Sequence, residues 1–189
     1  MSLWLSPRRI VKTRLALVSL ITWLLLSACA GNPYEVGELQ PYINPAFGFR
    51  VDTPSNWITS VDPSSLVGAR ADKLHAVAFV SQAVRARLVV YVQELDGDET
   101  LAGFAKRQMA GLRSTAGDAA FSEPAPVLLG GVGAMMTQAA VEQDGQAFLQ
   151  RTLFAIRNGR GYAVSIIAPA DSELAATLEQ MLASFGFVQ

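Results

Sequence analysis

The chain has one cysteine, Cys29, and it stands at the end of an apolar run. Four basic residues open the sequence, namely Arg8, Arg9, Lys12 and Arg14. An uncharged run from Leu15 to Leu26 follows them, and Ser27-Ala28 places small side chains directly before the cysteine. Basic, apolar and small residues in this order are typical of an export signal that is removed from the mature protein. We therefore expect the chemistry of Cys29 to take place outside the folded domain.

The four residues Leu26-Ser27-Ala28-Cys29 resemble the lipobox of bacterial lipoproteins. The resemblance implies that the thiol of Cys29 takes a diacylglyceryl group, that the leader is cut before it, and that the new amine is acylated. Two or more acyl chains make membrane anchoring stable. Ala30, rather than an aspartate, follows the cysteine, which implies the inner leaflet of the outer membrane, facing the periplasm, if the cell has two membranes.

Two alternatives to a lipoprotein remain open, a signal peptide without lipid and a retained membrane helix. The uncharged stretch before Gly31-Asn32-Pro33 is shorter than the roughly 17 to 25 residues that cross the hydrocarbon core. The stretch therefore favours the cleaved leader.

Nucleophilic catalysis by a serine needs a base, and His75 is the only histidine. The sequence has no Gly-x-Ser-x-Gly elbow, so we interpret His75 as a structural residue of a strand. Paired carboxylates from distant segments remain a possible basis for glycoside hydrolysis.

Metal and phosphate sites find no support in the residue pattern. One histidine and a lipidated cysteine are too few ligands for zinc or copper. Neighbouring strand residues face opposite sides, so Met135-Met136 cannot chelate jointly. The run Asp96-Gly97-Asp98-Glu99 lacks EF-hand spacing, and Gly130-Gly131-Val132-Gly133 lacks the lysine of a phosphate loop. We expect no metal and no cofactor, and the sequence identifies no ligand-binding residues.

Arginines offer one candidate for binding an anion. Arg85 and Arg87 are expected on one strand face, where Arg151 or Arg157 would complete a patch. The alternative is a solvated face, which the spacing favours.

Composition predicts three segments: a signal peptide at 1–28, the lipidated cysteine with a flexible tether at 29–46, and one globular domain at 47–189. Removal of the leader leaves 161 residues with 11 basic and 16 acidic side chains, a net charge of −5. A mildly acidic chain has no electrostatic footprint for nucleic acid. Without a second cysteine, the domain must be stabilised by packing alone.

The elements that would position these residues follow from periodicity. Apolar and β-branched runs predict strands at 74–81 and 88–93, and apolar residues at helical spacing predict a helix over 101–112. Asp144-Gly145 and Asn158-Gly159 predict tight hairpins within an antiparallel meander from 132 to 168. A final helix is expected after Pro169, ending near Phe185.

The stretch Gly48-Phe49-Arg50-Val51-Asp52-Thr53-Pro54-Ser55-Asn56-Trp57 is similar to the opening of PsbP-like and DcrB-like domains. The ending, Gly161-Tyr162-Ala163-Val164-Ser165 and then a helix closing on Ser184-Phe185, also resembles theirs. The resemblance implies an α+β fold, an antiparallel β-sheet with helices packed on its faces. Trp57 is interpreted as a core residue, with a ligand-stacking aromatic as the alternative.

The resemblance also implies a family that binds or helps to assemble other components. We therefore predict a non-catalytic, lipid-anchored envelope protein with a protein partner. The alternatives are a carrier or sensor of a small molecule and a hydrolase that uses carboxylates.

Overall fold

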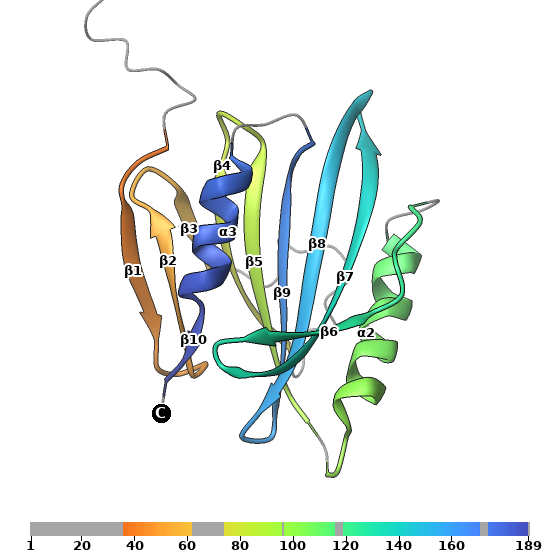
Figure 1. Cartoon of the computed structure of the whole chain (residues 1–189). Helices are drawn as coiled ribbons and strands as arrows, with labels where there is room; N and C mark the ends of the chain where they lie inside the picture. The colour runs from red at the N-terminus through yellow and green to blue at the C-terminus, as the bar shows by residue number, and fades with distance from the viewer. Residues whose placement is uncertain (1–35, 62–73, 96, 116–118, 171–173, 189) are drawn as a thin grey trace, which may run out of the picture. The chain divides into compact units, whose positions relative to one another are not determined.

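The computed structural model describes residues 36–61, 74–95, 97–115, 119–170 and 174–188 (Figure 1). The predicted leader, Cys29 and the lipobox lie outside these residues, as do the side chains of Leu74 and His75. Within the described part of the chain, no helix is long and apolar enough to cross a membrane.

The described strands form two sheets in which every pair is antiparallel. The larger sheet has seven strands in the order β3-β4-β5-β9-β8-β7-β6, and the smaller has three in the order β1-β2-β10. The strands are β1 (Leu39–Asn44), β2 (Phe49–Pro54), β3 (Ile58–Ser60), β4 (Leu74–Ser81), β5 (Ala86–Glu94), β6 (Ala125–Leu129), β7 (Val132–Gln143), β8 (Gln146–Arg157), β9 (Arg160–Pro169) and β10 (Gly186–Phe187).

Tight turns connect β6, β7, β8 and β9 into the predicted meander. Asp144 and Gly145 have φ of 53° and 72°, and Asn158 and Gly159 have 51° and 72°. Positive φ at both central residues is what a type I′ turn requires, and its twist matches that of the strands. The hairpin predictions are therefore confirmed.

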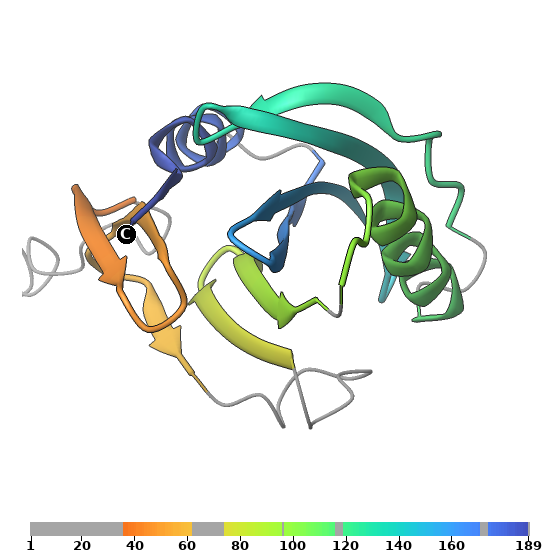
Figure 2. The same ribbon diagram turned by 90° about the horizontal axis from the view of Figure 1, so that it is seen from below.

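Two helices lie on opposite faces of the seven-stranded sheet (Figures 1 and 2). Helix α2 (Leu101–Thr115) packs Phe104 edge-on against Phe154 of β8, with ring centroids 6.3 Å apart. Helix α3 (Ala175–Ser184) buries Leu178 and Met181 in the other face, which also receives the small sheet. The side chains of β8 thus alternate between two cores. The α+β fold with helices on both faces of the sheet is confirmed.

The main core contains Trp57, which is 8% exposed, together with Phe49, Val51 and the inner residues of β4, β5 and β9. This placement confirms the interpretation of Trp57 as a core residue.

The expectation of an irregular tether up to residue 46 is wrong in its last part, because Leu39–Asn44 forms β1. β1 pairs along its whole length with β2, and Tyr42 packs edge-on against Phe79 of β4 at 4.9 Å. Pro41 made the segment look irregular, but β1 is an edge strand, and an edge strand tolerates a proline. The sequence prediction also had one sheet where the structure has two.

Candidate functional site

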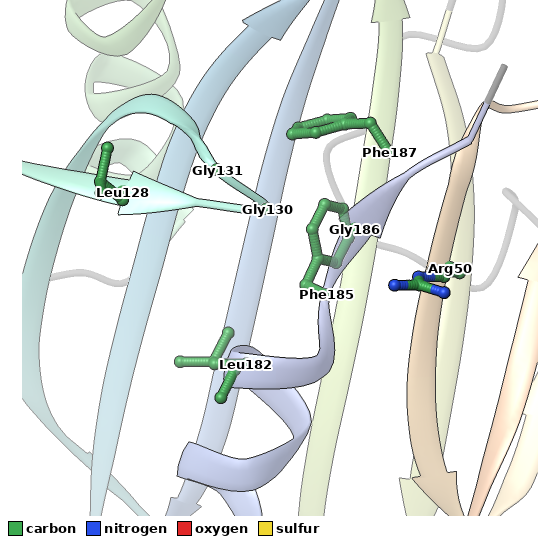
Figure 3. A pocket seen from close by; sticks show the side chains of 9 residues that line it. Arg50, Leu128, Gly130, Gly131, Leu182, Phe185, Gly186 and Phe187 are labelled. Atoms are coloured by element: carbon green, nitrogen blue, oxygen red, sulfur yellow. The ribbon is translucent and has the colours of Figure 1, made fainter.

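A hollow of about 460 Å³ lies where the β6–β7 turn meets the C-terminal end of α3 and strand β10 (Figure 3). We call it the β6–α3 hollow. Its lining comes from four separate parts of the chain, β2, the β6–β7 turn, α3 and β10, and consists of Arg50, Leu128, Gly130, Gly131, Leu182, Ala183, Phe185, Gly186 and Phe187.

Two glycines allow the walls of this hollow to approach each other. Gly130 has φ of 56°, and a Cβ there would lie 3.0 Å from Cδ2 of Phe187. A Cβ on Gly186 would lie 3.0 Å from Nε of Arg50. Because neither glycine has a side chain, the β6–β7 turn sits directly against β10, and the Arg50 side chain lies across Gly186.

Two aromatic residues of the lining, Phe185 and Phe187, pack on each other and on rings from other strands. Phe185 stacks on Phe49 with centroids 5.8 Å apart, and Phe187 lies edge-on to Phe185 at 5.4 Å and to Tyr162 at 4.9 Å. The Tyr162 hydroxyl donates to the carbonyl of Phe47 at 3.0 Å. The rings therefore join the small sheet to β9 of the large sheet.

The rim of the hollow combines exposed apolar surface with one charge. Leu128 is 74% exposed, the largest value among the exposed large hydrophobic residues that the structure describes. Arg50 is also exposed, and it forms no ion pair or hydrogen bond through its side chain to any described residue. It is the only ionisable residue of the lining. The hollow can therefore bind an apolar group beside an anion, but its lining supplies no acid–base pair.

A second, smaller hollow of about 90 Å³ lies beside the N-terminal half of α3. Leu149, which is 41% exposed, lines it, and the guanidinium of Arg151 is paired with the carboxylate of Glu179. Hydrolysis by two carboxylates needs two acids across a cleft. Neither hollow provides them, since the larger one has no acid in its lining and the smaller has only Glu179.

The arginines considered as an anion-binding patch do not gather, which agrees with the favoured reading of separate solvated residues. Arg85 has φ of 55° in the β4–β5 turn, where it pairs with Asp144 at 2.9 Å and covers the ring of Phe148. Arg87 lies on the opposite face of the sheet from Arg151, because strand alternation places Arg87 with Val89 and Arg151 with the α3 side. Arg85, Arg87 and Arg151 therefore lie in different places and do not form one binding surface.

Other residues singled out in the sequence take structural places. Met135 packs in the core under α2 and Met136 in the core under α3, so the pair faces opposite sides as predicted. Gly130 and Gly131 form the turn into β7. Glu99 binds Arg107 at 2.8 Å. Among the described residues, no three metal-ligating side chains gather. His75 lies on β4, but its side chain is outside the described part.

Two tyrosines have perturbed ionisation, and neither lines the hollow. Burial raises the pKa of Tyr91, while the positive charge of Arg87 opposes that rise. Burial likewise raises the pKa of Tyr162, against the opposing charge and hydrogen bond of Arg160. Burial therefore favours the neutral form of both phenols.

Sequence reasoning missed the residues that form the β6–α3 hollow. Arg50 reads as an ordinary polar residue of an alternating strand, and Leu128 as part of an apolar run leading into a glycine turn. One signal was present: the two adjacent apolar residues Leu128-Leu129 must point to opposite sides of a strand, so one of them faces away from the core.

No protein-family model and no curated protein matches this sequence. Solved structures do match. The cyanobacterial PsbP (CyanoP) of Synechocystis sp. PCC 6803 aligns with a TM-score of 0.58 at 15% identity, over 84% of this chain and 97% of that chain. A Bacteroides thetaiotaomicron protein aligns with a TM-score of 0.54 at 12% identity, over 82% of this chain and 50% of that chain. The Ran-binding protein Mog1p of Saccharomyces cerevisiae aligns with a TM-score of 0.51 at 14% identity, over 81% of this chain and 97% of that chain. These likenesses confirm the PsbP-like fold.

Proposed function

We propose that this chain is a non-catalytic, lipid-anchored protein of the cell envelope that binds a protein partner through the β6–α3 hollow. The observation that carries the proposal is Leu128, a large apolar side chain that is 74% exposed at the rim of a 460 Å³ hollow with aromatic walls. Apolar surface gathered around a concave site is typical of protein-binding surfaces.

The chemistry of the lining supports binding rather than catalysis. Arg50 is the only ionisable lining residue, so no nucleophile–base pair and no pair of carboxylates faces the space. Mog1p, which shares the fold, is described as Ran-binding. That likeness is an analogy of fold and supports the proposal only at the level of partner binding.

The anchor is the second part of the proposal. The lipobox-like residues Leu26-Ser27-Ala28-Cys29 would place acyl chains on Cys29 and hold the domain near a membrane. The residues between Cys29 and β1 would then separate the domain from the lipid headgroups.

Photo-crosslinking tests the partner proposal in native membranes. A photoreactive benzophenone amino acid replaces Leu128 in the full chain, and an affinity tag inserted after Asn32 recovers the product. The matched control places the same amino acid at Ile58, which is 53% exposed on β3, at the opposite edge of the large sheet from β6. We expect one dominant crosslinked protein from position 128 and none from position 58. Equal products from both positions, or none from either, would refute the proposal.

A small-molecule carrier is the second candidate function, and the volume of the hollow favours it. About 460 Å³ lies within the range of roughly 300 to 1,000 Å³ that is usual for ligand sites. Native mass spectrometry of the purified full chain separates the two functions, because a carrier retains a ligand mass that Leu128→Arg removes.

A further inference from the structure

The outer edge of β6 offers unpaired backbone groups at the rim of the β6–α3 hollow. β6 is the last strand of the seven-stranded sheet, so only β7 pairs with it. Leu129 and Val132 close a two-residue turn and form a hydrogen-bonded pair. In the alternating antiparallel pattern, the next pair, Leu128 with Gly133, is not hydrogen-bonded, so the N–H and C=O of Leu128 point away from β7.

Pro126 confirms this register and shortens the usable edge. It occupies the next outward-facing position, opposite Met135, where its missing N–H costs no hydrogen bond to β7. The outer edge therefore has one donor, at Leu128, and two acceptors, at Leu128 and Pro126. Such an edge can pair with a short extended segment and not with a long strand.

A charge stands at the other side of the same hollow. Arg50 comes from β2, and its guanidinium lies beside Gly186, across the aromatic pair Phe185 and Phe187 (Figure 3). No described residue pairs with it and no acid lines the hollow, so this exposed guanidinium is available to an anionic group of a ligand. A guanidinium recognises a carboxylate best, because it can donate two parallel hydrogen bonds.

We propose, building on the partner function above, that the β6–α3 hollow binds an extended segment of a partner protein that carries an acidic residue near an apolar one. Its backbone pairs with the free N–H and C=O of Leu128, its apolar side chain packs on Leu128 and Leu182, and its carboxylate binds Arg50. A sphere of about 460 Å³ would be roughly 10 Å across, the length of about three residues of extended chain. We therefore expect the two side chains to stand two to three residues apart.

The combination favours a peptide over a lipid. An acyl chain with an acidic head would satisfy Arg50 and the apolar rim, but it would leave the donor and acceptor of Leu128 unused. Strand addition to a free edge uses these backbone groups for affinity and the neighbouring side chains for selectivity.

A phage-displayed library of random heptapeptides tests the proposal on the full chain in detergent micelles. We expect enriched peptides with Asp or Glu two or three positions from Leu, Ile or Phe. Enrichment without an acidic residue, or no enrichment, would overturn the proposal.

Binding measurements with synthetic copies of the most enriched peptide then test the proposed contacts one at a time. We expect Arg50→Gln to weaken binding about tenfold or more, as the loss of a charge-assisted hydrogen bond predicts. The same loss should follow when the peptide acid becomes its amide, and the two changes together should cost no more than either alone. We also expect that methylating the peptide backbone one N–H at a time abolishes binding only when the methylated N–H is the one that pairs with the C=O of Leu128.

Matched controls distinguish this inference from the partner function. The Ile58→Arg variant should bind the peptide with the affinity of the unmutated protein, whereas the Leu128→Arg variant should not bind it. Arg50, Ile58 and Leu128 are all exposed, and circular dichroism checks that each variant is folded. If Arg50→Gln binds normally while the crosslink at position 128 persists, the partner function stands and the acidic extended segment is refuted. If the crosslink also fails, both are refuted.

Discussion

Replacement of Gly161 by alanine tests the packing of α2 on the sheet. A Cβ at Gly161 of β9 would lie 2.5 Å from Cε2 and 2.6 Å from Cζ of Phe104. The ring must move by about 1 Å to reach ordinary contact, yet Phe104 is 1% exposed and packed against Phe154. Overpacking of this kind costs about 1–3 kcal/mol. Alanine also restricts the unfolded chain, which favours the folded state by about 0.4–1 kcal/mol. We therefore expect the free energy of unfolding to fall by up to about 2.5 kcal/mol, with about 1.3 kcal/mol as the central value.

Gly111→Ala is the matched control, because it makes the same chemical change where nothing lies within 4 Å. Gly111 lies inside α2, and alanine there should stabilise the protein by about 0.8–1 kcal/mol through helix propensity. Urea denaturation followed by circular dichroism measures both variants. The reasoning also predicts that Gly161→Ala costs less in a Phe104→Leu background. Equal effects of the two glycine replacements, or the same cost in both backgrounds, would refute the clash as the cause.

Three further predictions concern ionisation, a turn and the anchor. Because burial raises the pKa of Tyr91 and Tyr162, their contribution to stability is complete below the ordinary pKa of about 10 and is lost as the pH rises through the raised values. The urea midpoint should therefore fall between pH 9 and 12, and Tyr91→Phe should reduce the fall; a midpoint independent of pH would contradict this. Asn158→Val places a β-branched residue at φ of 51° and should cost about 1–2 kcal/mol, whereas Asn158→Gly should be nearly neutral in the same denaturation assay. Cys29→Ser should release the protein from the membrane fraction or block its processing, and a mutant of mature mass that still sediments with membranes would rule out the lipid anchor.

The sequence predicted best those features that depend on a few neighbouring residues. Asp144-Gly145 and Asn158-Gly159 fix their turns locally, since few other residue pairs accept positive φ at both positions. The strand run that became β8 was recognisable from its own residues, and the structure shows that each side of it carries an apolar set for one of the two cores. These features need no knowledge of distant contacts.

Features that depend on distant contacts were missed or wrong. β1 becomes a strand because β2 lies beside it, and nothing within 39–44 overcomes the signal of Pro41. The candidate arginine patch, which the sequence reading did not favour, does not form because Arg85 lies in a turn and pairs with Asp144, 59 residues away. The β6–α3 hollow unites residues from four segments, so only the tertiary structure shows that Arg50 and Leu128 border one space.

The pairing of β10 with β2 has a consequence for when the hollow exists. The Asp52 N–H donates to Ser184 Oγ at 2.7 Å across 132 residues, and Gly186 and Phe187 pair with the same part of β2. Contacts between such distant residues cost chain entropy before they are rewarded, so we expect them to form late in folding. A partly folded chain therefore lacks one wall of the hollow and cannot bind there. Binding at this site would distinguish the finished domain from its folding intermediates, as a conformation-specific antibody does.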